Sequence, residues 1–211
     1  MARRLTDVTR RSRFLLHRHQ TQARGLRPPF SHDDALVASL LLIEVANTWQ
    51  SFMRRYFLTS AVGGLLAFGG AVSGSGMSRS GSEALDRAVL FNRPNAVKSA
   101  RGWDYRDEPN WMDPTIVSRT LHHLNLSNAS GFTSAMSAGS GSYDRLYSCR
   151  NFVAHRNRGT ALKVRQLARN EGVRHNLDPL ELPHLPGRAR PQSLVCDWLD
   201  ELIAIVELVP Q

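Results

Sequence analysis

The stretch DDALVASLLLIEVANTWQSFMRRYFLT, residues 33–59, is the longest helical pattern in the chain and decides its fold class. It follows a Pro28-Pro29 pair, and Ser31 stands three residues before Asp34, as in a capping box at the start of a helix. Apolar residues surround most of its circumference, which is typical of a helix at the centre of a bundle. We therefore expect a long central helix over these residues.

One side of this central helix is polar. Helical geometry places its polar residues along one stripe, which faces either solvent or an internal polar site. The stripe consists of Glu44, Asn47, Thr48, Ser51, Arg54 and Arg55.

The other segments carry helical periodicity without useful β-alternation, which indicates an all-α protein. In MDPTIVSRTLHHLNL, residues 112–126, Asp113 as N-cap and Pro114 at the first helical position mark a helix start. Ser82 is expected to cap a helix over 83–92. Further helices are expected over 143–157 and 160–170, with a final helix from Pro191. The expected loops are 60–82 and 126–142, both Gly/Ser-rich, and 171–190, with three prolines.

Length and composition indicate an ordinary globular protein, with 211 residues, 42% hydrophobic and 21% charged. We expect residues 31–211 to form a single helical domain and residues 1–30 a basic N-terminal extension or helix. The arginine-rich stretch TRRSRFLLHRH, residues 9–19, has an apolar run far shorter than the roughly 7–15 residues of an export signal.

Neither a membrane nor an oxidising compartment is indicated by the sequence. The most apolar window, residues 56–72, is shorter than the roughly 20 residues that span a bilayer, and glycines interrupt it. Cys149 and Cys196 form neither a metal-binding cysteine motif nor a disulfide framework, and both lie in apolar helical patterns. We expect a soluble, cytoplasmic protein with two reduced core cysteines.

The chain is strongly basic, with a formal net charge of +9 and an isoelectric point near 10.7. Of its 27 lysines and arginines, only Lys98 and Lys163 are lysines. Arginine's planar fork of donors matches phosphate oxygens, which points to nucleic acid or another polyanion. A genome biased towards arginine is the alternative, and charge alone selects no function.

In SYDRLYSCRNFVAHRNRG, residues 142–159, Arg150 and His155 are separated by four residues. In so arginine-rich a chain, about one such spacing is expected by chance. A second match, Arg27 to His32, contains two prolines and cannot lie on a regular helix. Context therefore has to distinguish the two pairs.

Arg150 and His155 share a helix that has a core-facing stripe. Helical geometry sets the two side chains about 140° apart, with Asn151 between them in angle, so both border one groove without pairing face to face. The stripe consists of Leu146, Cys149, Phe152 and Val153.

The segment RNFVAH, residues 150–155, resembles the signature of HEPN-domain proteins. In that family an arginine, usually followed by a polar residue such as asparagine, precedes a histidine on a late helix. The resemblance extends to the long early helix with its internal Glu44. It also includes EPNWMDPTIVSRTLHHLNLSNA, residues 108–129, which is similar to a Trp-x-Asp-Pro helix start in one branch of the family. It covers roughly 33–158, and neither 60–82 nor the C-terminal third matches a known pattern.

The resemblance implies a HEPN-like helical bundle, here with an extra C-terminal helix and a Gly/Ser-rich insertion. It implies a homodimer in which two arginine-histidine helices face each other and form a metal-independent endoribonuclease site that needs no cofactor. Such proteins act as toxins or defence effectors on RNA, so an antitoxin or another defence-system protein is a possible partner. The alternative is a catalytically inactive HEPN-like module that binds RNA or a protein.

The residue chemistry fits cleavage of RNA by its own 2′-hydroxyl. Histidine titrates near neutrality and serves as acid or base, and arginine offers a permanent charge to phosphate oxygens. A symmetric dimer supplies two His155 side chains to one groove. Asn151 would orient the histidine or the phosphate, while Glu44 and Tyr147 would support Arg150 or His155.

Each of these assignments has an ordinary alternative: a surface histidine at a fraying helix end, a solvated amide and a salt-bridged glutamate. The RNA-binding candidates are Arg54, Arg55, Arg156, Arg158, Lys163 and Arg165. Trp103, Tyr105 and Trp111 either stack on RNA bases or pack a loop onto the bundle. His122 and His123 lack further metal ligands at suitable spacing and are expected to be surface residues.

Overall fold

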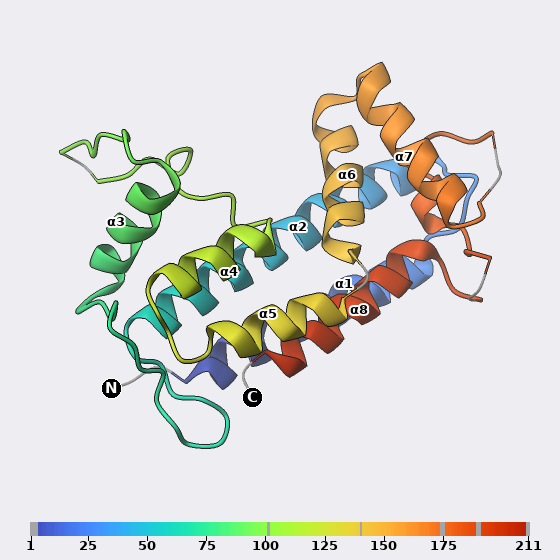
Figure 1. Cartoon of the computed structure of the whole chain (residues 1–211). Helices are drawn as coiled ribbons and strands as arrows, with labels where there is room; N and C mark the ends of the chain where they lie inside the picture. The colour runs from blue at the N-terminus through green and yellow to red at the C-terminus, as the bar shows by residue number, and fades with distance from the viewer. Residues whose placement is uncertain (1–3, 101, 140, 174–175, 189–190, 210–211) are drawn as a thin grey trace. The chain divides into compact units, whose positions relative to one another are not determined.

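The computed structural model describes residues 4–100, 102–139, 141–173, 176–188 and 191–209. These residues form helices and no strand, so the predicted all-α class is confirmed (Figure 1). The elements are α1 (Leu5–Gly25), α2 (His32–Ala61), α3 (Gly81–Asn92), α4 (Pro114–His123), α5 (Ala129–Ala138), α6 (Ser142–His155), α7 (Arg158–Asn170), the 3₁₀ helix η1 (Leu182–His184) and α8 (Leu194–Leu208).

The chain divides into two compact units. Unit 1 takes Met1–Ser12, Gln50–Ala138 and Ile205–Gln211, and unit 2 takes Arg13–Trp49 and Gly139–Ala204. Each of α1, α2 and α8 therefore contributes one part to each unit. The N-terminal segment that was expected as an extension or helix is helical from Leu5, and Leu5 and Leu16 are fully buried.

Unit 1 has an aromatic core around the second half of α2. Trp111 is fully buried with its ring 5.3 Å from that of Phe57, and Tyr56 stacks on Phe132 at 5.1 Å. The buried Asn128 donates from Nδ2 to the hydroxyl of Tyr56 over 2.8 Å. Aromatic side chains bury large areas, so this cluster anchors α5 and the segment before α4 to α2 within the unit.

The segment 126–142 was expected to be a link, and that prediction was wrong. It contains α5, which packs against α4 and buries Ala129, Phe132, Ala135 and Met136. These four residues have helical spacing. Alanine, serine and glycine make the segment resemble a linker in composition, and this hid its period.

The Gly/Ser-rich segment between α2 and α3 is a loop, as expected (Figure 1). A Cβ at Gly74 would clash with the backbone of Asn125, and one at Gly76 with the backbone of Leu124. Gly76 donates its N–H to the carbonyl of Leu124 over 3.0 Å. These glycines therefore allow the loop to lie against the turn between α4 and α5.

Helix α3 begins two residues earlier than predicted, because Ser80 and not Ser82 is its N-cap. The hydroxyl of Ser80 accepts the N–H of Glu83 over 3.2 Å. The carboxylate of Glu83 accepts the N–H of Arg79 over 2.8 Å. The backbone N–H groups of Arg79 and Glu83 thus both gain hydrogen-bond partners at the start of α3, as in a capping box.

In unit 2 the predicted start of α2 is confirmed. The hydroxyl of Ser31 accepts the N–H of Asp34 over 3.1 Å and donates to its carboxylate over 2.7 Å. Trp49 of the same helix is buried, and Tyr143 of α6 stacks on it at 6.3 Å. Helix α2 thus supports α6 within this unit.

Helix α8 begins at Leu194, three residues later than the predicted start at Pro191. The N–H of Leu194 donates to the carbonyl of Leu185 over 3.0 Å, which ties the preceding segment to the end of η1. The carbonyl of Ser193 accepts the N–H of Asp197 over 3.1 Å, so regular helix follows only from there.

Within the described ranges, α2 alone is long and apolar enough to cross a membrane by length and composition. Its most apolar window is 56% buried, and a core helix of a soluble protein has the same features. Cys149 and Cys196 are both free and buried, as expected. Burial raises the pKa of the Cys149 thiol to about 12.

Candidate active site

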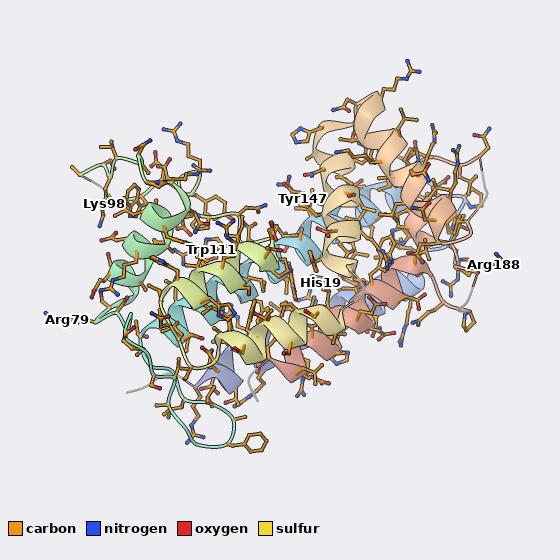
Figure 2. The ribbon with its side chains drawn as sticks, viewed as in Figure 1. His19, Arg79, Lys98, Trp111, Tyr147 and Arg188 are labelled. Atoms are coloured by element: carbon orange, nitrogen blue, oxygen red, sulfur yellow. The ribbon has the colours of Figure 1, made fainter. Side chains whose placement is uncertain are left out.

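Helix α6 separates a buried side from a polar side. Leu146, Cys149 and Phe152 are buried, as their spacing predicted. Tyr147, Asn151 and His155 follow one another at intervals of four residues and form a ridge on another side of the helix. Tyr147 and Asn151 are half-buried and His155 is exposed. Figure 2 labels Tyr147 on this helix.

Arg150 lies beside this ridge and contacts its middle residue. Its Nη1 donates to Asn151 Oδ1 over 3.3 Å, and its side chain is half-buried. No other hydrogen bond or ion pair of this guanidinium is found in the part of the chain that the structure describes. Asn151 thus contacts the arginine, and its suggested role in orienting the histidine or the phosphate stays a prediction.

His155 is the last residue of α6, and its side chain is exposed. Its ring makes no hydrogen bond with any residue in the described ranges. It lies about 40° around the helix from Asn151 and about 6 Å further along the axis. The imidazole is therefore accessible to a ligand that also reaches Asn151.

The turn after His155 is held by Arg156, which takes left-handed backbone angles of φ 39° and ψ 40°. Its N–H donates to the carbonyl of Phe152 over 2.7 Å. Its Nη2 donates to the Ser39 hydroxyl over 3.1 Å, and that hydroxyl donates to the carbonyl of Ala35 on α2 over 2.8 Å. The end of α6 is therefore tied to α2.

Ser39 is a positioning residue that the sequence did not indicate. It stands 117 positions before Arg156, and a serine inside an apolar helix carries no local signal of a distant partner. Only the packing of α6 beside this part of α2 brings the two side chains together.

Helix α7 follows the turn and packs against α6 (Figure 1). Its N-cap is Asn157, whose carbonyl oxygen Oδ1 accepts the N–H of Thr160 over 2.9 Å. An ion pair of 3.1 Å between Arg145 and Glu171 joins α6 to the end of α7. The basic candidates on this pair are Arg156, Arg158 and Lys163, which are exposed, and Arg165, which is half-buried.

Glu44 lies on α2 in the same unit and is exposed. No hydrogen bond or ion pair joins it to Arg150 or His155 within the described ranges. Its suggested role in positioning them stays a prediction. Solvent is the main environment of its polar stripe, since Asn47, Ser51 and Arg55 are also exposed.

The other two members of that stripe have internal partners. The hydroxyl of Thr48 shares a 3.1 Å hydrogen bond with His19 Nε2 inside unit 2. Arg54, in unit 1, donates two hydrogen bonds to Glu108, of 2.6 and 2.8 Å, and this contact raises the pKa of the guanidinium. Of the two RNA-binding candidates on this stripe, Arg55 is exposed and Arg54 is held in an ion pair.

Most of the remaining aromatic candidates pack the protein. Trp111 is fully buried and donates to Glu108 over 2.7 Å, and Trp103 donates to Asp86 over 2.8 Å. Tyr105 is 64% exposed.

His122 and His123 are exposed, as predicted, and His123 stacks on Phe91 at 4.0 Å. Across the described residues no group of three or more His, Cys, Asp or Glu side chains is placed to hold a metal ion.

Comparison with known proteins identifies no relative of this chain. No family model, no curated protein and no solved structure matches the chain. The candidate site therefore rests on its own residues: an exposed histidine, a neighbouring arginine held by Asn151, and the basic residues that follow them.

Proposed function

We propose that this chain is a HEPN-like endoribonuclease that cleaves RNA without a metal ion. The observation that carries the proposal is the exposed polar side of α6. There His155 has no described hydrogen-bond partner, and Arg150 contacts Asn151, which precedes His155 by one helical turn. Arg150, Asn151 and His155 are the proposed site residues, supported by Tyr147 and Glu44.

The proposed reaction is attack of the RNA 2′-hydroxyl on the adjacent phosphorus. The hydroxyl proton passes to a base, the P–O5′ bond breaks, and the leaving 5′-oxygen receives a proton from an acid. Imidazole performs both transfers near neutral pH. The guanidinium of Arg150 hydrogen-bonds to the phosphate oxygens, where negative charge accumulates in the transition state.

Base and acid must act on opposite sides of the phosphorus, and one chain supplies a single His155. A symmetric pair of chains places two copies of α6 at one groove, so that each contributes a histidine. The proposal therefore includes a homodimer. Its cellular setting would be the cytoplasm, as a toxin or defence effector with RNA as substrate and an antitoxin or related protein as partner.

The basic residues after His155 favour RNA as the ligand. Arg156 is exposed in the turn after α6, and Arg158 and Lys163 are exposed on α7. The same observation favours the second candidate function, a catalytically inactive module that binds RNA. That module would bind RNA with strong salt dependence, unaffected by replacement of His155.

The test is incubation of total RNA with purified protein in the presence of EDTA. We expect cleavage by the wild type and a loss of about 100-fold or more in His155→Ala, the scale of one acid-base group. His122→Ala, which replaces another exposed histidine, is the matched control and should keep full activity. Intact RNA with wild-type protein, or equal cleavage by His155→Ala, would contradict the proposal.

A further inference from the structure

Unit 2 contains a pocket of about 530 Å³ that has no part in the proposed cleavage site. It lies where the end of α1, the segment after it, η1 and the start of α8 come together. Its volume is in the range of small-molecule sites. The lining residues are Arg24, Arg27, Pro28, His184, Leu185, Pro186, Pro191, Gln192, Ser193 and Cys196.

The inner wall of the pocket includes His184, whose side chain is only 2% exposed. Neither of its ring nitrogens has a hydrogen-bond partner in the described part of the chain. Its ring packs edge-on to Phe30 at 5.2 Å, and burial lowers its pKa to about 4. A neutral imidazole has one donor and one acceptor nitrogen, and leaving both unpaired in the interior is costly.

Ser193 is a second buried polar group without a regular partner. It directly precedes α8, and its side chain is 7% exposed. A serine at this position normally accepts an amide of the first helical turn. Here Ser193 Oγ makes no hydrogen bond of regular geometry in the described residues, and its neighbour is the weakly bonding thiol of Cys196.

Arg24 and Arg27 give the pocket an exposed, positively charged rim. Neither forms an ion pair with any carboxylate of the described residues. The nearby carboxylates of Asp197 and Asp200 accept hydrogen bonds from the Gln192 side chain, over 2.6 and 2.7 Å. The start of α8 adds the positive end of a helix dipole to this part of the pocket.

Arg188 belongs to the same loop but is not a lining residue. Figure 2 labels it in the segment between η1 and α8, and its N–H donates to the carbonyl of Glu171 over 3.0 Å. Among the described residues, the positively charged side chains at the rim are therefore Arg24 and Arg27.

We propose that this pocket binds a small organic monophosphate whose other end is an uncharged polar ring. The phosphate dianion is held by the guanidinium groups of Arg24 and Arg27. The ring lies between the proline and leucine side chains of the wall. The side chains of His184 and Ser193, whose polar atoms are enclosed in this structure, turn towards it and hydrogen-bond to it. Both orphaned polar groups and both rim charges are then satisfied by one ligand.

The test is isothermal titration of the full chain at constant ionic strength with four probes: uridine and adenosine 5′-monophosphate, inorganic phosphate and uridine. We expect at least one of the two nucleotides to bind saturably at one site. Its affinity should be at least about 10-fold higher than that of phosphate or uridine, because only the nucleotide engages both ends of the pocket. Absence of saturable nucleotide binding, or binding no tighter than that of inorganic phosphate, would overturn the proposal.

Variants locate the binding. The pair Arg24→Gln with Arg27→Gln should weaken nucleotide binding about 10-fold or more, and Ser193→Ala should also weaken it. The pair Arg18→Gln with Arg169→Gln removes the same charge from exposed positions outside the pocket and should leave the affinity unchanged. Equal weakening in both pairs would mean that net charge alone attracts the nucleotide, against the proposal.

An independent readout does not require a substitution of the buried histidine. We expect the ring ¹⁵N resonances of His184 to move on nucleotide addition while those of the exposed His122 stay fixed. Unmoved His184 resonances at saturation would place the ligand elsewhere and overturn the assignment.

Discussion

Arg156 Nη2 lies 3.1 Å from Ser39 Oγ, so the residue directly after His155 is hydrogen-bonded to α2. The bond coincides with a left-handed backbone at Arg156, which is unfavourable for any residue with a Cβ. The exposed histidine thus stands at a helix end where Arg156 bonds to Phe152 through its N–H and to Ser39 through its side chain, at the cost of a strained backbone.

This strain predicts the order of stability of two variants at that turn. Arg156→Gly and Arg156→Ala both lose the contact with Ser39, but only glycine adopts the left-handed conformation without strain. We expect the glycine variant to be more stable than the alanine variant by about 1 kcal/mol in urea unfolding.

The control is the same pair of substitutions at Lys163, which is exposed within α7. There glycine should be the less stable of the two by about 1 kcal/mol, because the position is regular helix. If glycine is the less stable substitution at both positions, or the more stable at both, the assignment of strain to the Arg156 turn is contradicted.

A second prediction concerns the ion pair of Arg54 with Glu108. Their side chains are 34% and 7% exposed, so solvent reaches Arg54 and weakens the attraction in part, while Glu108 is buried. Glu108→Gln keeps the size of the side chain but weakens the contacts to Arg54 and Trp111. We expect it to lower the free energy of unfolding by about 2 kcal/mol.

The matched control for this pair is Asp7→Asn, which breaks the exposed contact of Asp7 with Arg10. That change should cost less than about 1 kcal/mol, as for surface pairs generally. If Glu108→Gln lowers the free energy of unfolding no more than Asp7→Asn does, the partly buried pair stabilises the fold no more than a surface pair, against the prediction.

His184 predicts a dependence of stability on pH. Its pKa is about 4 in the folded chain against an ordinary value of 6.5, because burial disfavours the charged ring. The unfolded chain therefore takes up this proton first, and the free energy of unfolding falls as the pH drops from about 6.5 towards 4. The full loss approaches about 3 kcal/mol.

Urea unfolding between pH 7.5 and 4 checks this with His184→Phe as comparison. Carboxylates titrate in both proteins, so the difference between the two curves isolates His184. We expect the variant to lose less stability on acidification, and His17→Phe, at an exposed position, to follow the wild type. Parallel curves for His184→Phe and the wild type would contradict the assignment.

Local signals were sufficient to predict much of the fold. The side chains of Ser31 and Asp34 each accept the other's backbone N–H, and Asp113 accepts the N–H of Thr115 directly after Pro114. The starts of α2 and α4 were therefore visible in the sequence. The start of α8 was not, because the bond from Leu194 to Leu185 depends on how the preceding loop folds back.

The candidate site was predictable in part for the same reason. The angular order of Arg150, Asn151 and His155 follows from helix geometry alone. The exposure of His155, the bond from Arg156 to Ser39 and the ion pair of Arg54 depend on packing between distant segments. No local pattern in the sequence encodes them.

The proposed composite site predicts the outcome of subunit mixing. When wild-type and His155→Ala chains are co-expressed and assemble at random, a site that needs two histidines forms only in wild-type pairs. Cleavage per total protein should then fall with the square of the wild-type fraction. A linear decrease would show that each chain cleaves RNA by itself.

The chemistry of the RNA ends produced in EDTA tests the central claim most directly. Attack by the 2′-hydroxyl, with Arg150 and His155 in their proposed roles, leaves a 2′,3′-cyclic phosphate and a free 5′-hydroxyl. We predict these ends from the wild type and from His122→Ala, with about 100-fold less product from Arg150→Ala and His155→Ala. Intact RNA, 5′-phosphate ends, or unchanged product from either site variant would contradict the account.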